Sequence, residues 1–584
     1  MKIKVSAPAL CLALLLALCF AAPAQAAGMT PSAGVVGTTV TISELAANKS
    51  YAIEWDGVEI KQGTLPGGGS VTFTVPDACG GNHTVTVENP VGTWVFAASF
   101  SVLPSIGINP NSGVIGDSVT VEGKGFAAAE SSIKVTYDGT DVKTGVSADS
   151  KGSWSTTFAV PSSAKGSHTV DVSGSTTKAG DVPDVTLTVS PKITLSPVSG
   201  DVGTSVSVSG TGFGKDEGGI RVTYDGTDAK TGASADSKGS WNVTFVVPNS
   251  IKGVHAIDAS GASTKADEIP DVTFIVSSAV RIKPNSGYVG DSITIDGCGF
   301  GGSESGITVT FDGSVVKSDI AANREGCWTT SLAIPASTGG SHFIDAYSAS
   351  TTAVDVADAK LAVLSKMVIE PAEGHVGCDI VVNGTGFGAD KELTIKYDNV
   401  AVFTKLVTDA KGNFQVSLKA PKSLGGKHNV TAADAGGASA SGVFAMETTS
   451  PSLPQIVSPR DGSRVGLFDR VAPTFEWAGV SDPSGVYYSL QVSSSQSDFA
   501  TTVLSKEDLV ESKYTLTDAE ALLRGKYYWR IKAVDGAGND SGWTTPILVK
   551  VGLMPLWAFI LVLVVAVAFV TRLVFFLRSI KRGH

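Results

Sequence analysis

The chain has 584 residues, of which 66 are glycine and only 17% are charged. That length exceeds what one hydrophobic core normally serves and is enough for several domains. A chain this rich in Gly with few charges indicates β-strands and turns, and it argues against helical bundles and coiled coils. Acidic residues outnumber basic ones 55 to 44. Because an acidic surface repels phosphate backbones, we expect no nucleic-acid partner.

The first 26 residues have the pattern of a secretory signal peptide. Two lysines precede an apolar run from Val5 to Phe20, and small residues close the segment at positions 24–26. We expect cleavage after Ala26 and export of the chain. The alternative of a lipoprotein signal at Cys19 is disfavoured, because Leu18 stands where that signal needs a small residue.

A domain-sized repeat follows the signal segment. Pro-x-x-Gly recurs five times, and the last four of its prolines are each 87 residues apart: Pro31, Pro110, Pro197, Pro284 and Pro371. Each unit continues with an alternating strand and, in units two to five, a Gly-x-Gly-Phe turn, as at residues 123–126. Period-two alternation closed by glycine predicts strand followed by turn. About seven short strands per unit predict a β-sandwich.

These repeats resemble IPT/TIG-type immunoglobulin-like domains, through the Pro-x-x-Gly, the Gly-x-x-Val strand and the Gly-x-Gly-Phe turn. The resemblance implies an all-β chain of tandem sandwiches. The five expected units are 27–104, 105–191, 192–278, 279–366 and 367–449. The first unit diverges from the others, since Ser43-Glu44-Leu45 replaces the Gly-x-Gly-Phe turn.

Residues 450–552 break the repeat and resemble a fibronectin type III module. The similarity rests on Phe475-Glu476-Trp477 and on the aromatic strand from Tyr527 to Asp535. We expect this module to be membrane-proximal, because an apolar segment follows it directly.

Residues 553–577 are predicted to form a transmembrane helix. Leu553 to Thr571 is 19 residues without a charge, long enough at 1.5 Å per residue to cross a core of about 30 Å. The tail 578–584 carries basic residues and no acid. We therefore expect a single-pass cell-membrane protein with its N-terminal region extracellular and its C-terminus cytoplasmic. Removing the six bases at the two ends leaves 38 against 55 acids, a net charge of −17 on the segment between.

Catalytic and cofactor motifs are not evident in the sequence. It shows no Gly-x-Ser-x-Gly at a strand-to-helix elbow, no His-Glu-x-x-His and no Walker loop. We therefore expect no enzyme, no cofactor and no metal, although an ion between modules at acids such as Asp181 and Asp184, or Asp267, Glu268 and Asp271, stays an alternative. A histidine recurs once per unit, and we interpret it as a structural turn residue: His83, His168, His255, His342 and His428.

A disulfide is predicted between Cys298 and Cys327. In an immunoglobulin-like sheet the strand that ends at the first cysteine and the strand that begins after the second are antiparallel neighbours. The exported location favours oxidation. Cys79 and Cys378 lie in different units and should remain unpaired, buried or intermolecular.

Two tryptophans of the divergent first unit, Trp55 and Trp94, are candidate ligand-contacting aromatics, because exposed indoles stack on sugar rings. The function that we expect is a membrane-anchored surface rod with a structural or adhesive role, with surface proteins or envelope glycans as partners. One alternative is a carbohydrate- or solute-binding ectodomain with unit one as its head. A surface hydrolase is the third.

Overall fold

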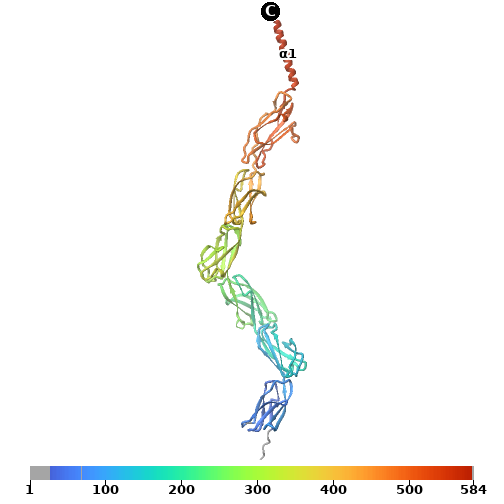
Figure 1. Cartoon of the computed structure of the whole chain (residues 1–584), viewed down its shortest axis with the longest axis vertical. Helices are drawn as coiled ribbons and strands as arrows, with labels where there is room; N and C mark the ends of the chain where they lie inside the picture. Colours follow the sequence, from blue (N-terminus) through green and yellow to red (C-terminus); the bar gives the residue numbers. More distant parts are fainter. Residues whose placement is uncertain (1–25, 68, 582–584) are drawn as a thin grey trace, which may run out of the picture. The chain divides into compact units, whose positions relative to one another are not determined.

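The computed structural model describes residues 26–67 and 69–581. The chain divides into two compact units, one ending at Ser277 and the other beginning at Ser278. From here on, "unit" means one of these two parts, and the sequence units above are called repeats. Each unit contains three immunoglobulin-like β-sandwiches, and helix α1, Leu556–Ile580, follows the last one at the red end of the ribbon (Figure 1). The predicted all-β fold with an apolar C-terminal helix is confirmed. The predicted signal peptide 1–26 lies, apart from Ala26, outside the described residues.

Every sandwich pairs a sheet of three or four strands with a sheet of five. In the second sandwich, β11 lies between β9 and β14, while the larger sheet runs β10-β16-β15-β12-β13 with β10 parallel to β16. The two sheets pack face to face because each strand has one apolar face. On β11, Val119 and Val121 are fully buried and alternate with polar residues.

The strands of the first unit have the following bounds. The first sandwich contains β1 Gly28–Thr30, β2 Ala33–Gly34, β3 Thr39–Ser43, β4 Ser50–Trp55, β5 Val58–Thr64, β6 Val71–Thr74, β7 Gly81–Glu88 and β8 Trp94–Val102. The second contains β9 Ser105–Asn109, β10 Ser112–Gly113, β11 Ser118–Lys124, β12 Ile133–Tyr137, β13 Thr140–Val146, β14 Trp154–Ala159, β15 Gly166–Ser173 and β16 Val185–Val189. The third contains β17 Lys192–Ser196, β18 Ser199–Gly200, β19 Ser205–Thr211, β20 Ile220–Tyr224, β21 Thr227–Ala233, β22 Trp241–Val246, β23 Gly253–Ser260 and β24 Val272–Val276.

The second unit repeats this arrangement. Its first sandwich contains β25 Ser278–Lys283, β26 Ser286–Tyr288, β27 Ser292–Cys298, β28 Ile307–Phe311, β29 Ser314–Ile320, β30 Trp328–Ala333, β31 Gly340–Tyr347, β32 Val356–Ala357 and β33 Ala359–Leu364. The next contains β34 Lys366–Glu370, β35 Glu373–Gly374, β36 Asp379–Thr385, β37 Glu392–Tyr397, β38 Val400–Val407, β39 Phe414–Lys419, β40 Gly426–Asp434 and β41 Ser439–Met446. The last contains β42 Ile456–Ser458, β43 Ser463–Val465, β44 Arg470–Val471, β45 Thr474–Trp477, β46 Val486–Ser493, β47 Leu504–Leu509, β48 Lys513–Thr515, β49 Leu522–Leu523, β50 Gly525–Asp535 and β51 Ile547–Val551.

Short 3-10 helices connect strands in four of the sandwiches. Their bounds are η1 Ala179–Asp181, η2 Ala266–Glu268, η3 Ala353–Asp355 and η4 Asp518–Glu520.

One glycine explains why the Gly-x-Gly-Phe turn and a following aromatic recur together. Gly123 on β11 pairs with Trp154 on β14, and a Cβ at Gly123 would lie 2.1 Å from Cε2 of the indole. The ring of Trp154 therefore covers the bare glycine and meets Phe126 edge-on at 5.4 Å. The same pairing occurs at Gly210–Trp241, Gly297–Trp328 and Gly384–Phe414.

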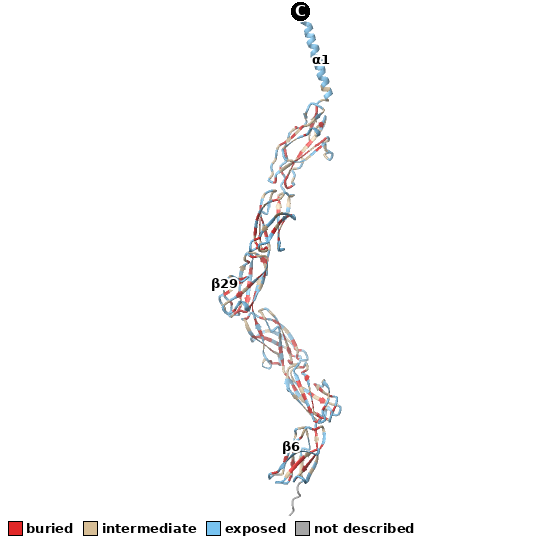
Figure 2. Cartoon of the chain, in the orientation of Figure 1, coloured by how far each residue is buried: buried red, intermediate tan, exposed pale blue. Residues whose placement is uncertain are grey.

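Each sandwich has its own hydrophobic core, so six separate clusters of buried side chains follow the chain. Figure 2 shows the buried residues inside the sandwiches and the exposed surface of α1. Two layers around one core are the standard way for sheets to bury their apolar faces. The domain boundaries at single-residue precision stay a prediction.

Candidate functional site

The recurring histidine of each repeat is bound through both of its ring nitrogens. We call this histidine, its aspartate and its carbonyl partner the histidine lock. In the fifth repeat, His428 Nδ1 lies 2.5 Å from Asp398 Oδ2, and His428 Nε2 lies 2.6 Å from the carbonyl oxygen of Leu424. The imidazole also stacks on Tyr397, with ring centroids 5.0 Å apart. The same histidine–aspartate pairs occur in all five repeats, at 2.5 to 2.7 Å: His83–Asp56, His168–Asp138, His255–Asp225, His342–Asp312 and His428–Asp398.

The aspartate of each pair is placed by a tight β-hairpin. Asp138 has φ 46° and Gly139 has φ 77°, which are the two left-handed residues of a type I′ turn between β12 and β13. The Tyr-Asp-Gly sequence therefore turns the chain and leaves the carboxylate beside the neighbouring strand β15. There Asp138 Oδ1 also accepts the backbone N–H of Thr169.

In the fifth repeat, the hydrogen bond between His428 and Asp398 stabilises the charged form of both side chains. The hydrogen bond from His428 is the main cause that holds the pKa of Asp398 below its usual value. Burial lowers the pKa of His428, but its hydrogen bonds to Asp398 and Leu424 outweigh that effect, so the net pKa is raised. The sequence interpretation of these histidines as turn residues is corrected, because each lies inside a strand and is paired with a carboxylate.

In four of the five repeats, the histidine stands next to a contact with the following sandwich of the same unit. His83 Nε2 lies 2.7 Å from the carbonyl oxygen of Cys79, and the next residue, Gly80, donates its N–H to the carbonyl of Phe126 at 2.7 Å. The equivalent bonds run from Lys165 to Phe213, from Gly339 to Phe387 and from Gly425 to Ala537. The histidine thus fixes the loop by which one sandwich binds the next.

A side-chain bridge reinforces one of these contacts. Lys165 Nζ lies 2.7 Å from Glu268 Oε2 and 2.5 Å from the carbonyl oxygen of Ser263, both in the third sandwich. The ion pair with Lys165 is the main cause that lowers the pKa of Glu268. Glu268, one of the acids considered above for an ion between modules, is therefore bound by a lysine.

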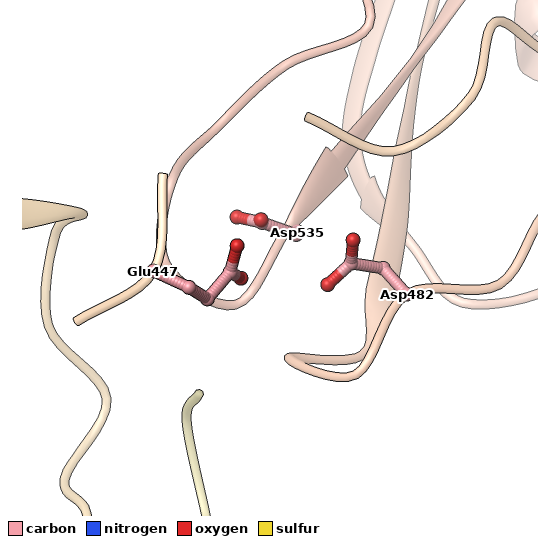
Figure 3. A group of neighbouring side chains, drawn as sticks. All are labelled: Glu447, Asp482 and Asp535. Atoms are coloured by element: carbon pink, nitrogen blue, oxygen red, sulfur yellow. The ribbon is translucent and has the colours of Figure 1, made fainter. Parts of the chain in front are cut away.

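Three carboxylates meet where the fifth repeat contacts the last sandwich. Glu447, Asp482 and Asp535 each bring an oxygen within 4.8 Å of the others, and Figure 3 shows their side chains converging. Asp535 is only 2% exposed. Carboxylate oxygens in this number are ligands that Ca²⁺ accepts. Sequence reasoning missed the group, because its members come from three segments that are far apart in the chain.

The three carboxylates also have roles in the local backbone. Asp535 accepts the N–H and the side-chain amide of Asn539, both at 2.8 Å, while Glu447 accepts the hydroxyl of Ser484 at 2.6 Å. Asp482 accepts the N–H of Ser484 at 2.9 Å. A cavity of about 710 Å³ opens beside them, lined in part by Glu447 and Asp482. These hydrogen bonds stabilise the junction between the fifth repeat and the last sandwich, so the three carboxylates have a structural role.

A turn of sequence Asp-x-x-Gly also recurs, at residues 149–152, 236–239 and 409–412, and its role is structural. Asp149 Oδ1 accepts the N–H groups of Lys151 and Ser153, at 2.8 and 2.9 Å. The backbone N–H of Ser153 is the main cause that lowers the pKa of Asp149. Its carboxylate thus serves its own turn.

The two candidate aromatics of the first sandwich differ. Trp55 is 6% exposed, lies in the core and stacks on His83 at 5.0 Å, so its face is not accessible to a sugar. The expectation for Trp55 is therefore wrong, because it occupies the place that Tyr137 has in the second repeat. The sequence Trp55-Asp56-Gly57, which corresponds to Tyr137-Asp138-Gly139 of the second repeat, could have indicated this core position. Trp94, at the start of β8, is 59% exposed.

The cysteines lie as follows. The structure joins Cys298 and Cys327, which continue the register of the Gly297–Trp328 pair between β27 and β30. Cys79 and Cys378 are free and half-buried.

Among solved structures, the chain is similar to the N-terminal eight Ig domains of Down syndrome cell adhesion molecule, with 10% identity, a TM-score of 0.19, and coverage of 91% of this chain and 73% of that one. It is also similar to a tetra-tandem repeat from the extending region of a large adhesion protein, with 14% identity, a TM-score of 0.17, and coverage of 59% and 99%. It is similar as well to invasin, a bacterial integrin-binding protein, with 12% identity, a TM-score of 0.17, and coverage of 64% of this chain and 82% of that one. Such identities and TM-scores carry no argument about function.

Sequence comparison identifies a domain family, whereas the structural similarities show only the fold. No curated protein matches the chain. The family model of the IPT/TIG domain matches residues 105–189, 191–271 and 278–353. These three consecutive segments, which lie in the second, third and fourth sandwiches, match the IPT/TIG domain.

Proposed function

We propose that the chain is a membrane-anchored cell-surface rod with a structural or adhesive role. The observation that carries this proposal is the repeated junction inside each unit, where a histidine-locked loop donates a backbone hydrogen bond to the next sandwich. Repeated short contacts favour a stiff chain of modules over a flexible string. Such a chain holds its distal modules away from the membrane.

The anchor in this proposal is α1. Its 25 residues have a mean hydropathy of 2.9 in their most apolar window, and none is buried against the protein. The signal-like residues 1–26 and the basic tail favour an extracellular N-terminal region and a cytoplasmic C-terminus.

The partners in this proposal are surface proteins or envelope glycans. Tandem repeats offer many weak contacts, which add up when a surface engages several modules together. The recurring polar side chains of the repeats are engaged in locks and turns, so we assign no catalytic role.

Binding of a soluble form tests the proposal. Residues 27–552 and a version lacking 27–104 would be incubated with isolated envelope polysaccharide and with whole host cells. Distributed adhesion predicts that both forms bind. Loss of binding with the first module would instead make that module the recognition head. Absence of binding by either form would contradict adhesion and leave a purely structural rod.

A second candidate, glycan binding by the first sandwich, is favoured by the exposed Trp94. Val91 and Val95 are 50% and 42% exposed beside it in sequence. The β7–β8 turn lies at the opposite end of these strands from Gly81, whose neighbour Gly80 binds the second sandwich. Trp94 is thus at the free end of the module.

Substitution of this indole tests the second candidate. Trp94→Ala is expected to abolish polysaccharide binding if the first module is the head. Phe343→Ala, which removes an aromatic that is 43% exposed on another sandwich, is the matched control. Equal binding by both variants would exclude Trp94 as the contact.

A further inference from the structure

The last sandwich joins α1 through a short, hydrogen-bonded connection. Strand β51 ends at Val551 and α1 begins at Leu556. Between them, Leu553 and Met554 both donate their N–H groups to the carbonyl of Leu467, at 3.2 Å. The segment 465–469 thus holds the chain just before the helix.

The start of α1 is capped by the same segment. The N–H of Leu556 donates to Asp469 Oδ2 at 3.0 Å, which satisfies one of the free donors of the first helical turn. A carboxylate at this end also complements the helix dipole. Since Asp469 belongs to the sandwich, this bond fixes the helix to the folded module.

An aromatic contact extends this attachment into the first turn of the helix. The rings of Phe468 and Phe559 meet edge-on, with centroids 5.1 Å apart. Within α1, Leu556 to Leu577 spans about 33 Å at 1.5 Å per residue with Arg572 as its only charged residue, close to the thickness of a hydrocarbon core. If α1 spans the membrane, the core begins within the first turn of α1, past the Asp469–Arg524 pair at Leu556, and Phe468 lies at the depth of Phe559.

Apolar side chains are exposed around this attachment. Leu467 is 56% exposed and Leu523 is 65% exposed, while Phe468 is 37% exposed. On a soluble surface such a group would be costly to leave in water. Leu553 and Trp557, at 48% and 69%, continue the surface into α1.

Basic side chains surround the apolar ones. The strands on this side of the sandwich carry four of them: Arg464, Arg470, Lys526 and Lys550. A fifth base, Arg524, pairs with Asp469 at 3.6 Å. Arg464 pairs in register with Lys550, and Lys550 with Lys526, so three bases lie side by side across neighbouring strands. This is a basic end on a chain whose net charge is −11.

We propose that this end of the last sandwich docks on the membrane that α1 crosses. Leu467 and Phe468 insert into the nearest leaflet, and the side chains of Arg464, Arg470, Lys526 and Lys550 contact anionic headgroups. The inference rests on the proposed anchoring by α1. Its occupant is the lipid surface, because the apolar side chains continue directly into the helix and the bases complement phosphate. The module then stands on the membrane in a fixed orientation.

Spin labels on the full mature chain in nanodiscs of phosphatidylglycerol and phosphatidylcholine test the docking. In a background of Cys79→Ser and Cys378→Ser, single labels at Leu467→Cys, Val510→Cys and Leu563→Cys report accessibility to oxygen and to a water-soluble nickel complex. Val510 is 73% exposed on the same sandwich and is the matched control. Near-UV circular dichroism checks that each variant is folded.

The docking predicts lipid-like accessibility at positions 467 and 563 and water-like accessibility at position 510. A water-like label at 467 together with a lipid-like label at 563 would overturn the docking and leave the anchor intact. A water-like label at 563 would overturn the anchor and the docking with it.

The contribution of charge is tested by Lys526→Gln with Lys550→Gln. Each base near an anionic surface is worth about a five-fold change in affinity, so the pair should raise the ratio of water-exposed to membrane-docked label at 467 by up to about twenty-five-fold. Lys143→Gln with Lys230→Gln removes the same charge from exposed positions of the first unit and should change nothing. Equal behaviour of the two double variants would overturn the headgroup contact.

Discussion

His428 and Asp398 form an ion pair in which both ring nitrogens of the histidine face acceptors. Nδ1 lies 2.5 Å from the carboxylate and Nε2 lies 2.6 Å from the carbonyl of Leu424. A neutral imidazole donates from one nitrogen only, so it can satisfy one of these two acceptors. The protonated ring can donate to both acceptors, and although burial lowers the pKa of His428, these two hydrogen bonds outweigh that effect and raise it. The same pair of contacts, to an aspartate and to a carbonyl oxygen, is found in all five repeats.

The stability of the fifth repeat should consequently fall as the solution becomes alkaline. Because the folded pKa of His428 is raised, its contribution is complete below about pH 6.5, the unfolded value, and is lost as the pH rises through the folded pKa. Asp398 has a lowered pKa, so its contribution is lost on the acid side, as the pH falls through its folded pKa, which lies below 3.8. We expect the histidine ring to titrate above its ordinary pKa in NMR spectra.

The variant His428→Gln checks this assignment. Removing a hydrogen bond to a charged group costs about 1.5 to 3 kcal/mol, and local hydrogen exchange of β40 measures the loss. The difference from the native chain should be largest below about pH 6.5 and should shrink above it. A difference that is constant with pH would show that the ring is neutral.

A buried carboxylate of the third repeat predicts a separate acid sensitivity. Glu217 is 5% exposed, and its oxygens accept hydrogen bonds from the Thr264 side chain and from the backbone N–H groups of Ser263, Thr264 and Gly214. Burial raises the pKa of Glu217, but these bonds outweigh it and lower the pKa to about 2. Its contribution is therefore present above pH 4.5 and is lost as the pH falls toward 2.

Glu217→Gln should destabilise the third repeat by about 1 to 3 kcal/mol, because the neutral amide cannot accept all four bonds. Hydrogen exchange of β20 and β23 at neutral pH measures the effect. The exposed Glu122→Gln on β11 is the control and should have no effect. If both variants exchange alike, the carboxylate contributes nothing to the fold.

Much of the architecture could be predicted from the sequence because its signals are local. Alternating strands, the Gly-x-Gly-Phe turn and a fixed spacing each report on neighbouring residues, and together they predict a sandwich per repeat. The first repeat shows the limit of such signals. Trp55 looked distinctive by residue type, yet its neighbours Asp56 and Gly57 place it in the core position that tyrosine has in other repeats.

The rest depends on pairing between distant segments. Asp398 lies 30 residues before His428, and only the antiparallel pairing of β37 with β40 brings them together. Glu447 follows β41, Asp482 lies in the loop before β46, and Asp535 ends β50, so no spacing rule connects them. The contact of Phe468 with Phe559 requires the register of the last sandwich against the start of α1.

The covered glycine of the second repeat gives a prediction about packing. A methyl group at Gly123 would meet the Trp154 ring at 2.1 Å, and the indole is buried against Phe126. Gly123→Ala should therefore destabilise this repeat by about 1 to 3 kcal/mol, measured by hydrogen exchange of β11 and β14. Gly107→Ala on the adjacent β9, where a Cβ meets no atom within 4 Å, is the control. Equal stability of the two variants would mean that the indole moves aside without cost.

The bond between Cys298 and Cys327 makes a prediction that is confined to one repeat. The bridge closes a loop of 29 residues, and a loop of about that length contributes roughly 3 to 4 kcal/mol by restricting the unfolded chain. The equivalent positions in the third repeat are Thr211 and Ser240, so that repeat folds without a bridge. Reduction should therefore lower the stability of the fourth repeat and leave the third unchanged.

Peptide mapping of the mature chain without reductant provides the direct measurement, and it should recover the two cysteines in one linked fragment. The variant Cys298→Ser with Cys327→Ser should unfold the fourth repeat at lower denaturant, while Cys79→Ser controls for loss of a thiol elsewhere. Because the loop effect acts on the unfolded chain, the double variant should keep the native pairing of β27 with β30. Recovery of both cysteines as free thiols would refute the bridge.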